Sequence, residues 1–288
     1  MPELPEVQTT VNDLNKKIVG RKITGAWFDW GKTIKSPLRE FEKNIKGKKI
    51  LKVERLAKNI LIYLSGDFIL LVHQKMTGHL LVGKWKIEGK KVIPIEPKHI
   101  ISDPQNRFVH LILFLDNGQM LALSDLRKFA KVILGTKNYM ENLPELKELG
   151  PDALEIRFED FKNIVGQKHG KIKQILMDQT AISGIGNIYS DEMLWVAKIH
   201  PFKPANKLSE KELKNLYSAM KKVLEKALKL RGTSVSDYRD IEGREGKYAD
   251  VRYVYQREDE KCQRCGTMIK RVKMGGRSAH YCPKCQKL

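Results

Sequence analysis

The four cysteines of the chain lie within its last 27 residues, in two pairs with 16 residues between them. They are Cys262, Cys265, Cys282 and Cys285. Two Cys-x-x-Cys knuckles can supply four thiolates to one tetrahedral ion, so the spacing indicates a structural zinc ribbon with every position filled. Two disulfides are the weaker alternative, because we find no signal peptide and such pairs are poor frameworks for secreted proteins.

The ribbon region is strongly basic. Its positive side chains are Arg264, Lys270, Arg271, Lys273, Arg277, Lys284 and Lys287. A small metal-held hairpin with this charge is suited to present Arg and Lys side chains to phosphate groups. The alternative is a ribbon that only stabilises the end of the chain.

The opposite end of the chain begins Met1-Pro2-Glu3. Removal of Met1 would expose Pro2 as a secondary amine, and because α-amino groups titrate at about pH 7.7–8.0, a fraction would be unprotonated at neutral pH. Such an amine can attack an aldehyde-like carbon and form an iminium ion, while Glu3 beside it could transfer protons. Taken alone the pattern is weak, because proline is common at position two.

The 288-residue chain carries a net charge of +20 and has a pI near 9.7. Such charge attracts polyanions, since displacing condensed counterions from DNA or RNA is favourable at low salt. A lysine-rich solvated surface is the alternative. The composition, 41% hydrophobic and 31% charged, indicates a soluble protein with packed cores. No apolar run of about 20 residues could span a membrane, and we expect a cytoplasmic protein.

The first half of the chain predicts the strands that must position the N-terminus. Apolar runs at 59–64 and 68–73 flank a Ser-Gly-Asp turn, and runs at 108–115 and 119–123 flank an Asn-Gly turn. These runs are apolar enough to be buried on both faces, as in a sandwich. Residues 3–19 have apolar side chains at spacings of three and four, which predicts a helix.

Beyond residue 151 the apolar period changes to 3.6, which predicts helices. The apolar rows lie at 158–165, 172–176, 188–194 and 213–223. The Gly-rich segment 181–187 separates the second helix from the third, and Asn187 is a favourable N-cap. A helical hairpin with exposed turn amides suits phosphate binding. Residues 231–261 predict a long loop and a strand, with 251–255 leading into the ribbon.

The run Pro2–Val7, PELPEV, resembles the start of the bacterial formamidopyrimidine-DNA glycosylase/endonuclease VIII family. Further segments resemble motifs of that family, in the same order, along almost the whole chain. They are Lys58 within 55–58, the Met-Thr-Gly loop within 73–80, Asp-Leu-Arg-Lys-Phe at 125–129, a helix–two-turn–helix at 178–201, and the ribbon with Gly-Gly-Arg-Ser at 275–278. Motifs matched in this order are highly specific.

The resemblance implies an α+β multi-domain DNA-repair enzyme: an N-terminal β-sandwich with flanking helices, then a C-terminal helix–two-turn–helix domain with a zinc-ribbon finger. The bounds we expect are 1–135 for the catalytic sandwich, 136–151 for a linker, 152–261 for the helical domain with a lesion-capping loop, and 262–288 for the finger. We expect one structural Zn²⁺, no nucleotide or redox cofactor, damaged double-stranded DNA as partner, and a monomer.

By matching positions, Pro2 would attack C1′ of the damaged nucleoside and Glu3 would transfer protons as the sugar ring opens. Base loss and β,δ-elimination would then cut the strand on both sides of the sugar. Lys58 matches a catalytic lysine that contacts a phosphate near the lesion. Glu6 could support Pro2 or could only favour the start of a helix.

The resemblance also implies a set of DNA-contacting residues. They are Met76, Arg127 and Phe129, which would fill the space left by an extruded nucleotide, and Lys173, Asn187 and Arg277, of which the last two match phosphate contacts. Without the resemblance, side chains of these types would be assigned to a core, a surface ion pair or a solvated face.

Oxidised purines, such as 8-oxoguanine and formamidopyrimidines, are the implied substrates, because 127–129 and the Gly-rich segment 232–246 match the purine-lesion branch. The alternative is an endonuclease VIII-like enzyme that acts on oxidised pyrimidines. Leu126, Gln74-Lys75 and an expanded charged loop at 85–105 depart from the family pattern. A catalytically silent DNA-binding protein and an RNA-binding zinc-ribbon protein are alternatives from other classes.

Overall fold

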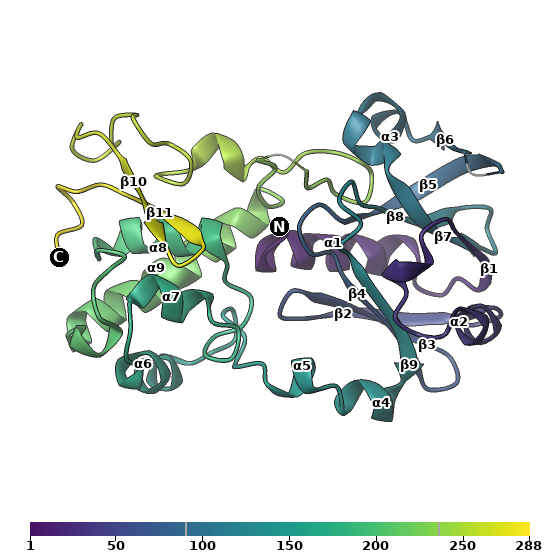
Figure 1. Cartoon of the computed structure of the whole chain (residues 1–288), viewed down its shortest axis with the longest axis horizontal. Helices are drawn as coiled ribbons and strands as arrows, with labels where there is room; N and C mark the ends of the chain where they lie inside the picture. The colour runs from purple at the N-terminus through teal and green to yellow at the C-terminus, as the bar shows by residue number, and fades with distance from the viewer. Residues whose placement is uncertain (90, 236) are drawn as a thin grey trace. The chain divides into compact units, whose positions relative to one another are not determined.

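The computed structural model describes all residues of the chain except Lys90 and Ser236. The chain forms two compact units (Figure 1), Met1–Lys147 with Leu230–Ala249, and Glu148–Lys229 with Asp250–Leu288. The predicted α+β architecture is confirmed. The division differs from the bounds expected from sequence, because 136–147 and 230–249 both belong to the first unit.

Two antiparallel sheets form the first unit, with strand orders β1-β7-β8-β5-β6 and β2-β3-β4-β9. The strands are β1 (Ile23–Phe28), β2 (Ile50–Leu56), β3 (Asn59–Leu64), β4 (Phe68–His73), β5 (His79–Glu88), β6 (Lys91–Glu96), β7 (Val109–Leu115), β8 (Met120–Ser124) and β9 (Lys131–Thr136). The helices are α1 (Leu4–Lys17), α2 (Leu38–Ile45), α3 (Lys98–Ser102), α4 (Lys137–Glu141) and α5 (Pro144–Lys147).

Strand β3 is buried on both faces, as its continuous apolar run predicts. Ile60 and Ile62 point into the main core, which also contains side chains of α1 and of the five-stranded sheet. Leu61 points the other way, into a cluster that Met140 of α4 covers. The segment 136–147 is therefore partly a packing element of the sandwich rather than a linker.

Much of the segment 85–105, expected to be a charged loop, forms secondary structure. β6 pairs antiparallel with β5 at the edge of the five-stranded sheet, and α3 follows it. Ile100 of α3 is fully buried in a cluster with Trp85, Leu81 and Ile112. The expectation was wrong here because a few apolar residues among many charges are enough to cover one face of the sheet.

The second unit contains α6 (Phe158–Gln167), α7 (Ile172–Met177), α8 (Asn187–Ala197) and α9 (Glu210–Lys229), and a hairpin of β10 (Lys270–Met274) and β11 (Arg277–Tyr281). The expected strand at 251–255 is absent from these described residues. Instead, the backbone N–H groups of Tyr253, Val254 and Tyr255 donate to the buried Glu192 carboxylate at 2.8–2.9 Å. These amides therefore bind a side chain and not a neighbouring strand.

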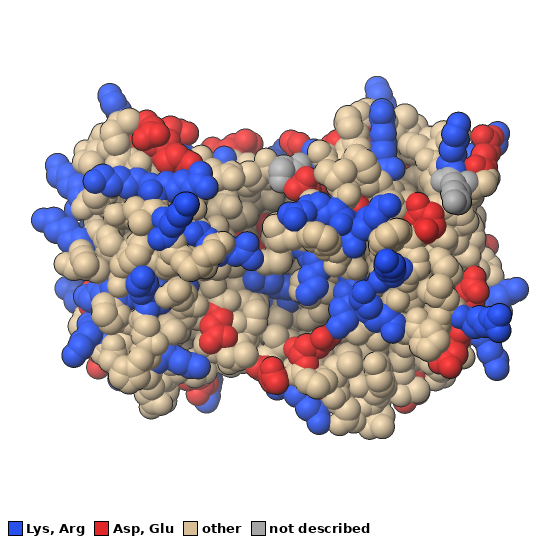
Figure 2. Space-filling model, in the orientation of Figure 1, with Lys and Arg blue, Asp and Glu red and all other residues tan. Residues whose placement is uncertain are grey.

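Positive side chains are abundant on the surface of both units. Figure 2 shows Lys and Arg across much of one face of each unit, with Asp and Glu in smaller groups. Within the part of the chain that the structure describes, no helix has the length and apolar character needed to cross a membrane.

Candidate active site and nucleic-acid interface

The N-terminal residues are held at the start of α1 by a reciprocal capping box. Pro2 is buried and Glu3, the N-cap, is 2% exposed. The Glu3 backbone N–H donates to Glu6 Oε2 at 2.8 Å, and the Glu6 backbone N–H donates to the Glu3 carboxylate. Because a capping box satisfies two helix-end donors at once, it fixes the backbone next to Pro2 and directs the Glu3 carboxylate to the positive end of the helix.

The second oxygen of the Glu6 carboxylate binds a loop that is distant in sequence. The Thr233 N–H donates to Glu6 Oε1 at 2.7 Å. Gly232 has a φ of +82°, and a Cβ there would lie 2.7 Å from Glu6 Oε1, so only glycine fits beside the carboxylate. Glu6 therefore completes the capping box with one carboxylate oxygen and binds the Thr233 backbone with the other.

Lys58 lies in the two-residue turn between β2 and β3, where Ala57 adopts a positive φ of 55°. It is 6% exposed, so its side chain is not a solvated surface lysine. Next to it in sequence, Asn59 pairs with His73 of β4. Burial, with the positive charges of Lys75 and Lys58, lowers the pKa of His73 to about 3. His73 is neutral, consistent with Nδ1 accepting the Lys75 N–H at 3.0 Å.

The loops that carry Met76, Arg127 and Phe129 are joined by Asp125. Its carboxylate binds the Thr77 hydroxyl in the Met76 loop and accepts the Ala130 N–H at 2.7 Å. The Arg127 N–H donates to Thr77 Oγ1 at 3.1 Å.

The expected void-filling side chains are available at the surface of these loops. Phe129 is 52% exposed, which is unusual for a phenylalanine, and the Arg127 guanidinium lies 4.6 Å from the centre of its ring. Met76 is partly exposed. An exposed aromatic ring, a guanidinium and a thioether on two joined loops have the properties that wedging into a base stack requires.

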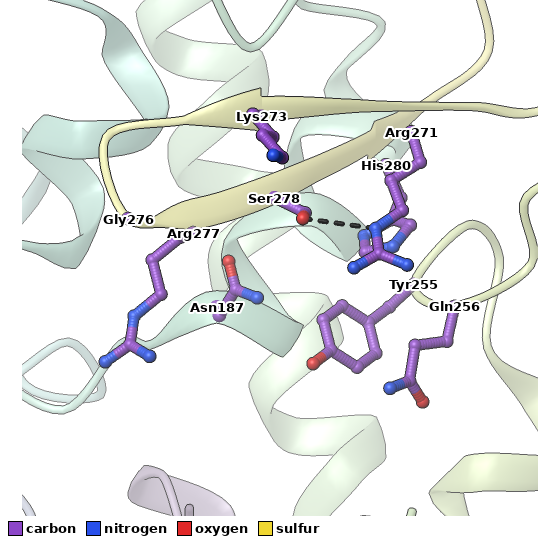
Figure 3. Close-up of a pocket in the computed structure, with 9 residues that line it drawn as sticks. All are labelled: Asn187, Tyr255, Gln256, Arg271, Lys273, Gly276, Arg277, Ser278 and His280. Atoms are coloured by element: carbon purple, nitrogen blue, oxygen red, sulfur yellow. Dashed lines mark hydrogen bonds between the residues drawn. The ribbon is translucent and has the colours of Figure 1, made fainter.

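In the second unit, Asn187 is the first residue of α8 and lines a pocket beneath the β10–β11 hairpin. The turn before it is held by Gln179, whose amide donates to Ile185 O at 2.8 Å and accepts the Gly184 N–H at 2.9 Å. Figure 3 shows Arg277 and Arg271 on opposite sides of Asn187, both extending from the hairpin. The other lining residues are Tyr255, Gln256, Lys273, Gly276, Ser278 and His280.

The hairpin turn places Arg277 in the lining of this pocket. Gly275 and Gly276 have φ angles of +47° and +68°, which fits a two-residue turn that needs positive φ at both positions. Arg277 follows directly and is exposed. Arg271 is oriented by Glu258 at 2.9 Å and by Ser278 Oγ at 3.1 Å. Sequence reasoning did not single out Tyr255, Gln256 or Arg271 as site residues, because nothing local links them to Asn187.

Lys173 does not fit the DNA contact expected for it. Its side chain is 0% exposed, and Nζ donates to Asp191 Oδ1 at 2.6 Å and to the Ser278 carbonyl at 2.7 Å. The same Asp191 carboxylate accepts the His280 N–H at 3.0 Å. Lys173 therefore connects α7 and α8 to the hairpin and cannot reach a phosphate.

The four cysteines form one cluster. Their Sγ atoms all lie within 4.8 Å of one another, with Cys265 and Cys282 3.4 Å apart. Four thiolates bound at about 2.3 Å to a tetrahedral Zn²⁺ would be about 3.8 Å apart, so the cluster fits such an ion. The Trp195 indole N–H also points at Cys262 Sγ, at 3.4 Å. The cysteines form a site able to hold a metal ion.

Comparison with known proteins places both units and the ribbon in one family. Residues 1–132 match the formamidopyrimidine-DNA glycosylase N-terminal domain, 149–239 match its H2TH domain, and 259–288 match a zinc finger found in FPG and IleRS. Formamidopyrimidine-DNA glycosylases of Pelotomaculum thermopropionicum and Heliobacterium modesticaldum are 42% and 36% identical over the full length of both chains.

Solved structures agree with the sequence comparison. Lactococcus lactis Fpg in complex with DNA containing an abasic site has a TM-score of 0.86 at 32% identity, covering 99% of this chain and 100% of that one. MutM in complex with DNA containing carbocyclic 8-oxo-G has a TM-score of 0.85 at 32% identity, covering 100% of each chain. The chain belongs to the formamidopyrimidine-DNA glycosylase family.

Proposed function

We propose that this protein is a bifunctional DNA glycosylase and abasic-site lyase of base-excision repair that removes oxidised purines such as 8-oxoguanine and formamidopyrimidines. The names of the relatives support this substrate class, and so do the abasic, Fapy-dG and 8-oxo-G lesions in the DNA of the similar structures. The observation that carries the proposal is the buried Pro2–Glu3 terminus, held by the capping box of Glu6. The oxidised-pyrimidine alternative has no comparable support.

The proposed chemistry begins with the secondary amine of Pro2, after removal of Met1. The amine attacks C1′, the glycosidic bond breaks and its electron pair leaves with the base. The ring oxygen of the sugar is then released as the iminium forms, and Glu3 supplies or accepts the protons that these steps move. Loss of a C2′ proton expels the 3′ phosphate, and a second elimination expels the 5′ phosphate. The iminium acts as the electron sink in both steps.

The proposed DNA contacts follow from exposure and charge. Lys58, beside the neutral His73, would bind a phosphate near the lesion, and Asn187 and Arg277 would bind phosphates at the hairpin pocket that they line. Met76, Arg127 and Phe129 would fill the space left by the extruded nucleotide. Lys173 is not among the DNA contacts, because it is fully buried.

We assign Zn²⁺ to the cysteine cluster, with a structural role. Its four ligands would be Cys262, Cys265, Cys282 and Cys285. Four protein ligands leave no open position for water, so the ion would stabilise the ribbon that carries Arg277 and would take no part in bond breaking.

Matched duplexes with one lesion each test the substrate class. In single-turnover assays we expect faster base release from 8-oxoguanine opposite cytosine than from thymine glycol opposite adenine. Glu3→Gln should slow strand cleavage by about 100-fold or more, as expected for loss of a general acid–base group. Faster release of thymine glycol would favour the endonuclease VIII-like alternative, and base release from neither duplex would contradict the glycosylase proposal.

A further inference from the structure

The loop beside the catalytic terminus, Gly232–Gly246, is attached to the first unit at two separate places. At its start, the Thr233 N–H binds Glu6, as described above. Just before it, the Arg231 guanidinium binds Asp13 Oδ2 at 2.5 Å and Asp240 Oδ2 at 2.8 Å. These contacts fix the start of the loop to α1, two hydrogen bonds away from the backbone of Glu3.

The second attachment is built around Arg239, whose side chain is only 6% exposed. Its guanidinium Nε binds Asp103 Oδ2, Nη2 binds Glu245 Oε1 at 2.9 Å, and Nη1 donates to the Tyr238 carbonyl at 2.8 Å. One buried side chain thus donates to the Tyr238 carbonyl and to Glu245, both in the loop, and to Asp103 in the segment after α3. Burial alone would raise the pKa of Asp103, but its hydrogen bonds with Arg239 and Gln105 lower it, so the Asp103 carboxylate is charged at neutral pH.

Asp103 is itself held in place by the turn that follows it. Its Oδ1 caps the short helix η2 (Pro104–Arg107) by accepting the Gln105 N–H at 2.9 Å. In the same helix, the Asn106 amide donates to the Gly243 carbonyl at 3.4 Å, and Asn106 Oδ1 lies 3.0 Å from His79 Nε2. Gly243 has a φ of +81°, and a Cβ there would lie 2.6 Å from Asn106 Nδ2. The end of the expanded segment 85–105 is therefore shaped to fit the loop.

We propose that the Arg239–Asp103 ion pair is a positioning contact for removal of the damaged base. It holds Tyr238 and Glu245 against the segment after α3, in the same loop whose Thr233 N–H binds Glu6. This inference rests on the proposed function. Because the base is one bond from C1′, a loop whose Thr233 N–H binds Glu6 is within reach of the base, whereas an abasic sugar offers it nothing to contact. The ion pair should therefore matter for base release and little for strand cleavage at an abasic site.

Two variants and two substrates test the proposal. Arg239→Gln removes the guanidinium, and Asp103→Asn keeps an acceptor for the Gln105 N–H while removing the charge. In single-turnover assays we expect either variant to slow base release from 8-oxoguanine opposite cytosine by about 10-fold or more, since small displacements of positioning groups have effects of this size. Cleavage of a duplex with a preformed abasic site should stay within about 2-fold of the wild type, and Arg239→Lys should give an intermediate rate of base release.

Lys84→Gln is the matched control. It makes the same change of charge in the same unit, at an exposed ion pair with Glu96 of 2.8 Å, and should leave both rates unchanged. Equal losses on both substrates would mean general destabilisation and would overturn the proposal, as would unchanged base release in both variants. If Arg239→Gln does not fold, Asp103→Asn alone decides. Failure of the wild type to release any base would instead contradict the proposed function itself.

Discussion

At the scale of single residues, the site depends on side chains that each serve more than one neighbour. The Glu6 carboxylate binds the Glu3 backbone with one oxygen and the Thr233 backbone with the other. Asp125 similarly joins the Met76 loop to the loop of Phe129. Because each carboxylate has its partners within one unit, the surroundings of Pro2 and the void-filling loops are fixed before any DNA binds. Such fixed groups reduce the ordering cost of binding.

The buried side chain of Gln74 lowers the stability of the folded protein. It is 1% exposed, and neither atom of its side-chain amide has a hydrogen-bond partner among the described residues. Leaving buried polar groups unpaired costs about 1–3 kcal/mol each. We therefore predict that Gln74→Leu raises the free energy of unfolding by about 1–3 kcal/mol in urea titrations. Gln119→Leu, at a partly buried residue in a surface turn, is the control, and a loss of stability in Gln74→Leu would show that the amide is satisfied.

His73 predicts how stability depends on pH. Its folded pKa, about 3, lies below the ordinary value of 6.5, because burial and nearby lysines disfavour the charged form. The unfolded chain therefore binds the proton more tightly than the folded protein. The contribution of the neutral His73 to the free energy of unfolding is complete above about pH 6.5 and is lost as the pH falls towards 3. At about pH 4 the loss is about 3 kcal/mol.

Comparing the wild type with His73→Gln tests this pH dependence directly. His73→Gln removes the titrating ring and keeps an acceptor for the Lys75 N–H, so its unfolding free energy should fall less than that of the wild type between about pH 7 and pH 4. Burial also lowers the pKa of His79, so the unfolding free energy of both proteins should still fall somewhat as the pH is lowered. Parallel curves for wild type and variant would contradict the assignment to His73.

At the scale of elements, the ribbon is a platform that sets the position of Arg277. The Gly275–Gly276 turn sets the direction of the arginine, and the buried Lys173–Asp191 pair connects the hairpin to the helices behind it. Trp195 adds a third support, since its indole N–H points at Cys262 Sγ and its ring stacks on Tyr253 with 4.4 Å between centroids. The cysteine cluster, the helices and the arginine are thus linked by short contacts within one unit.

Trp195→Phe should weaken metal binding at this platform. The change keeps the aromatic stack but removes the hydrogen bond to the Cys262 thiolate, and loss of such a supporting contact typically lowers metal affinity by about 10-fold to 100-fold. Competition with a chromogenic chelator measures the affinity directly. Trp85→Phe, in the other unit, is the matched control. Equal affinities of wild type and Trp195→Phe would show that the indole does not support the site.

Local sequence patterns predicted the helices and strands. The differences between prediction and structure come from contacts between residues far apart in the chain. The β3 run, the two Cys-x-x-Cys pairs and the run Pro2–Val7 each lie in a short stretch, so their structure or chemistry could be predicted from sequence. The attachment of Arg239 to Asp103 spans 136 positions, and no local period indicates it. The burial of Lys173 was missed for the same reason, because the Asp191 carboxylate and Ser278 carbonyl that bind it come from distant segments.

At the scale of the whole molecule, the net charge of +20 favours any polyanion, and specificity must come from particular side chains. Non-specific attraction and phosphate contacts both weaken with salt, because each releases counterions from the DNA. The number of phosphates that the protein neutralises can therefore be measured, and the contribution of one arginine can be separated from that of the general charge.

Arg277→Ala should reduce the salt dependence of DNA binding by a defined amount. The slope of log affinity against log salt concentration should become shallower by about 1, the contribution of one phosphate contact. Arg157→Ala is the control with the same charge change, because Arg157 lies outside the hairpin pocket and pairs with Asp160 on the surface. Equal slopes for the two variants would mean that Arg277 contributes only general charge.

The central claim, that Pro2 is the nucleophile, is tested most directly by borohydride trapping on a duplex with one 8-oxoguanine opposite cytosine. Reduction converts an iminium into a stable covalent adduct between protein and DNA, and mass mapping locates the attached residue. We predict an adduct on Pro2 in the wild type. An adduct on a lysine in the wild type, or cleavage without any adduct, would contradict it.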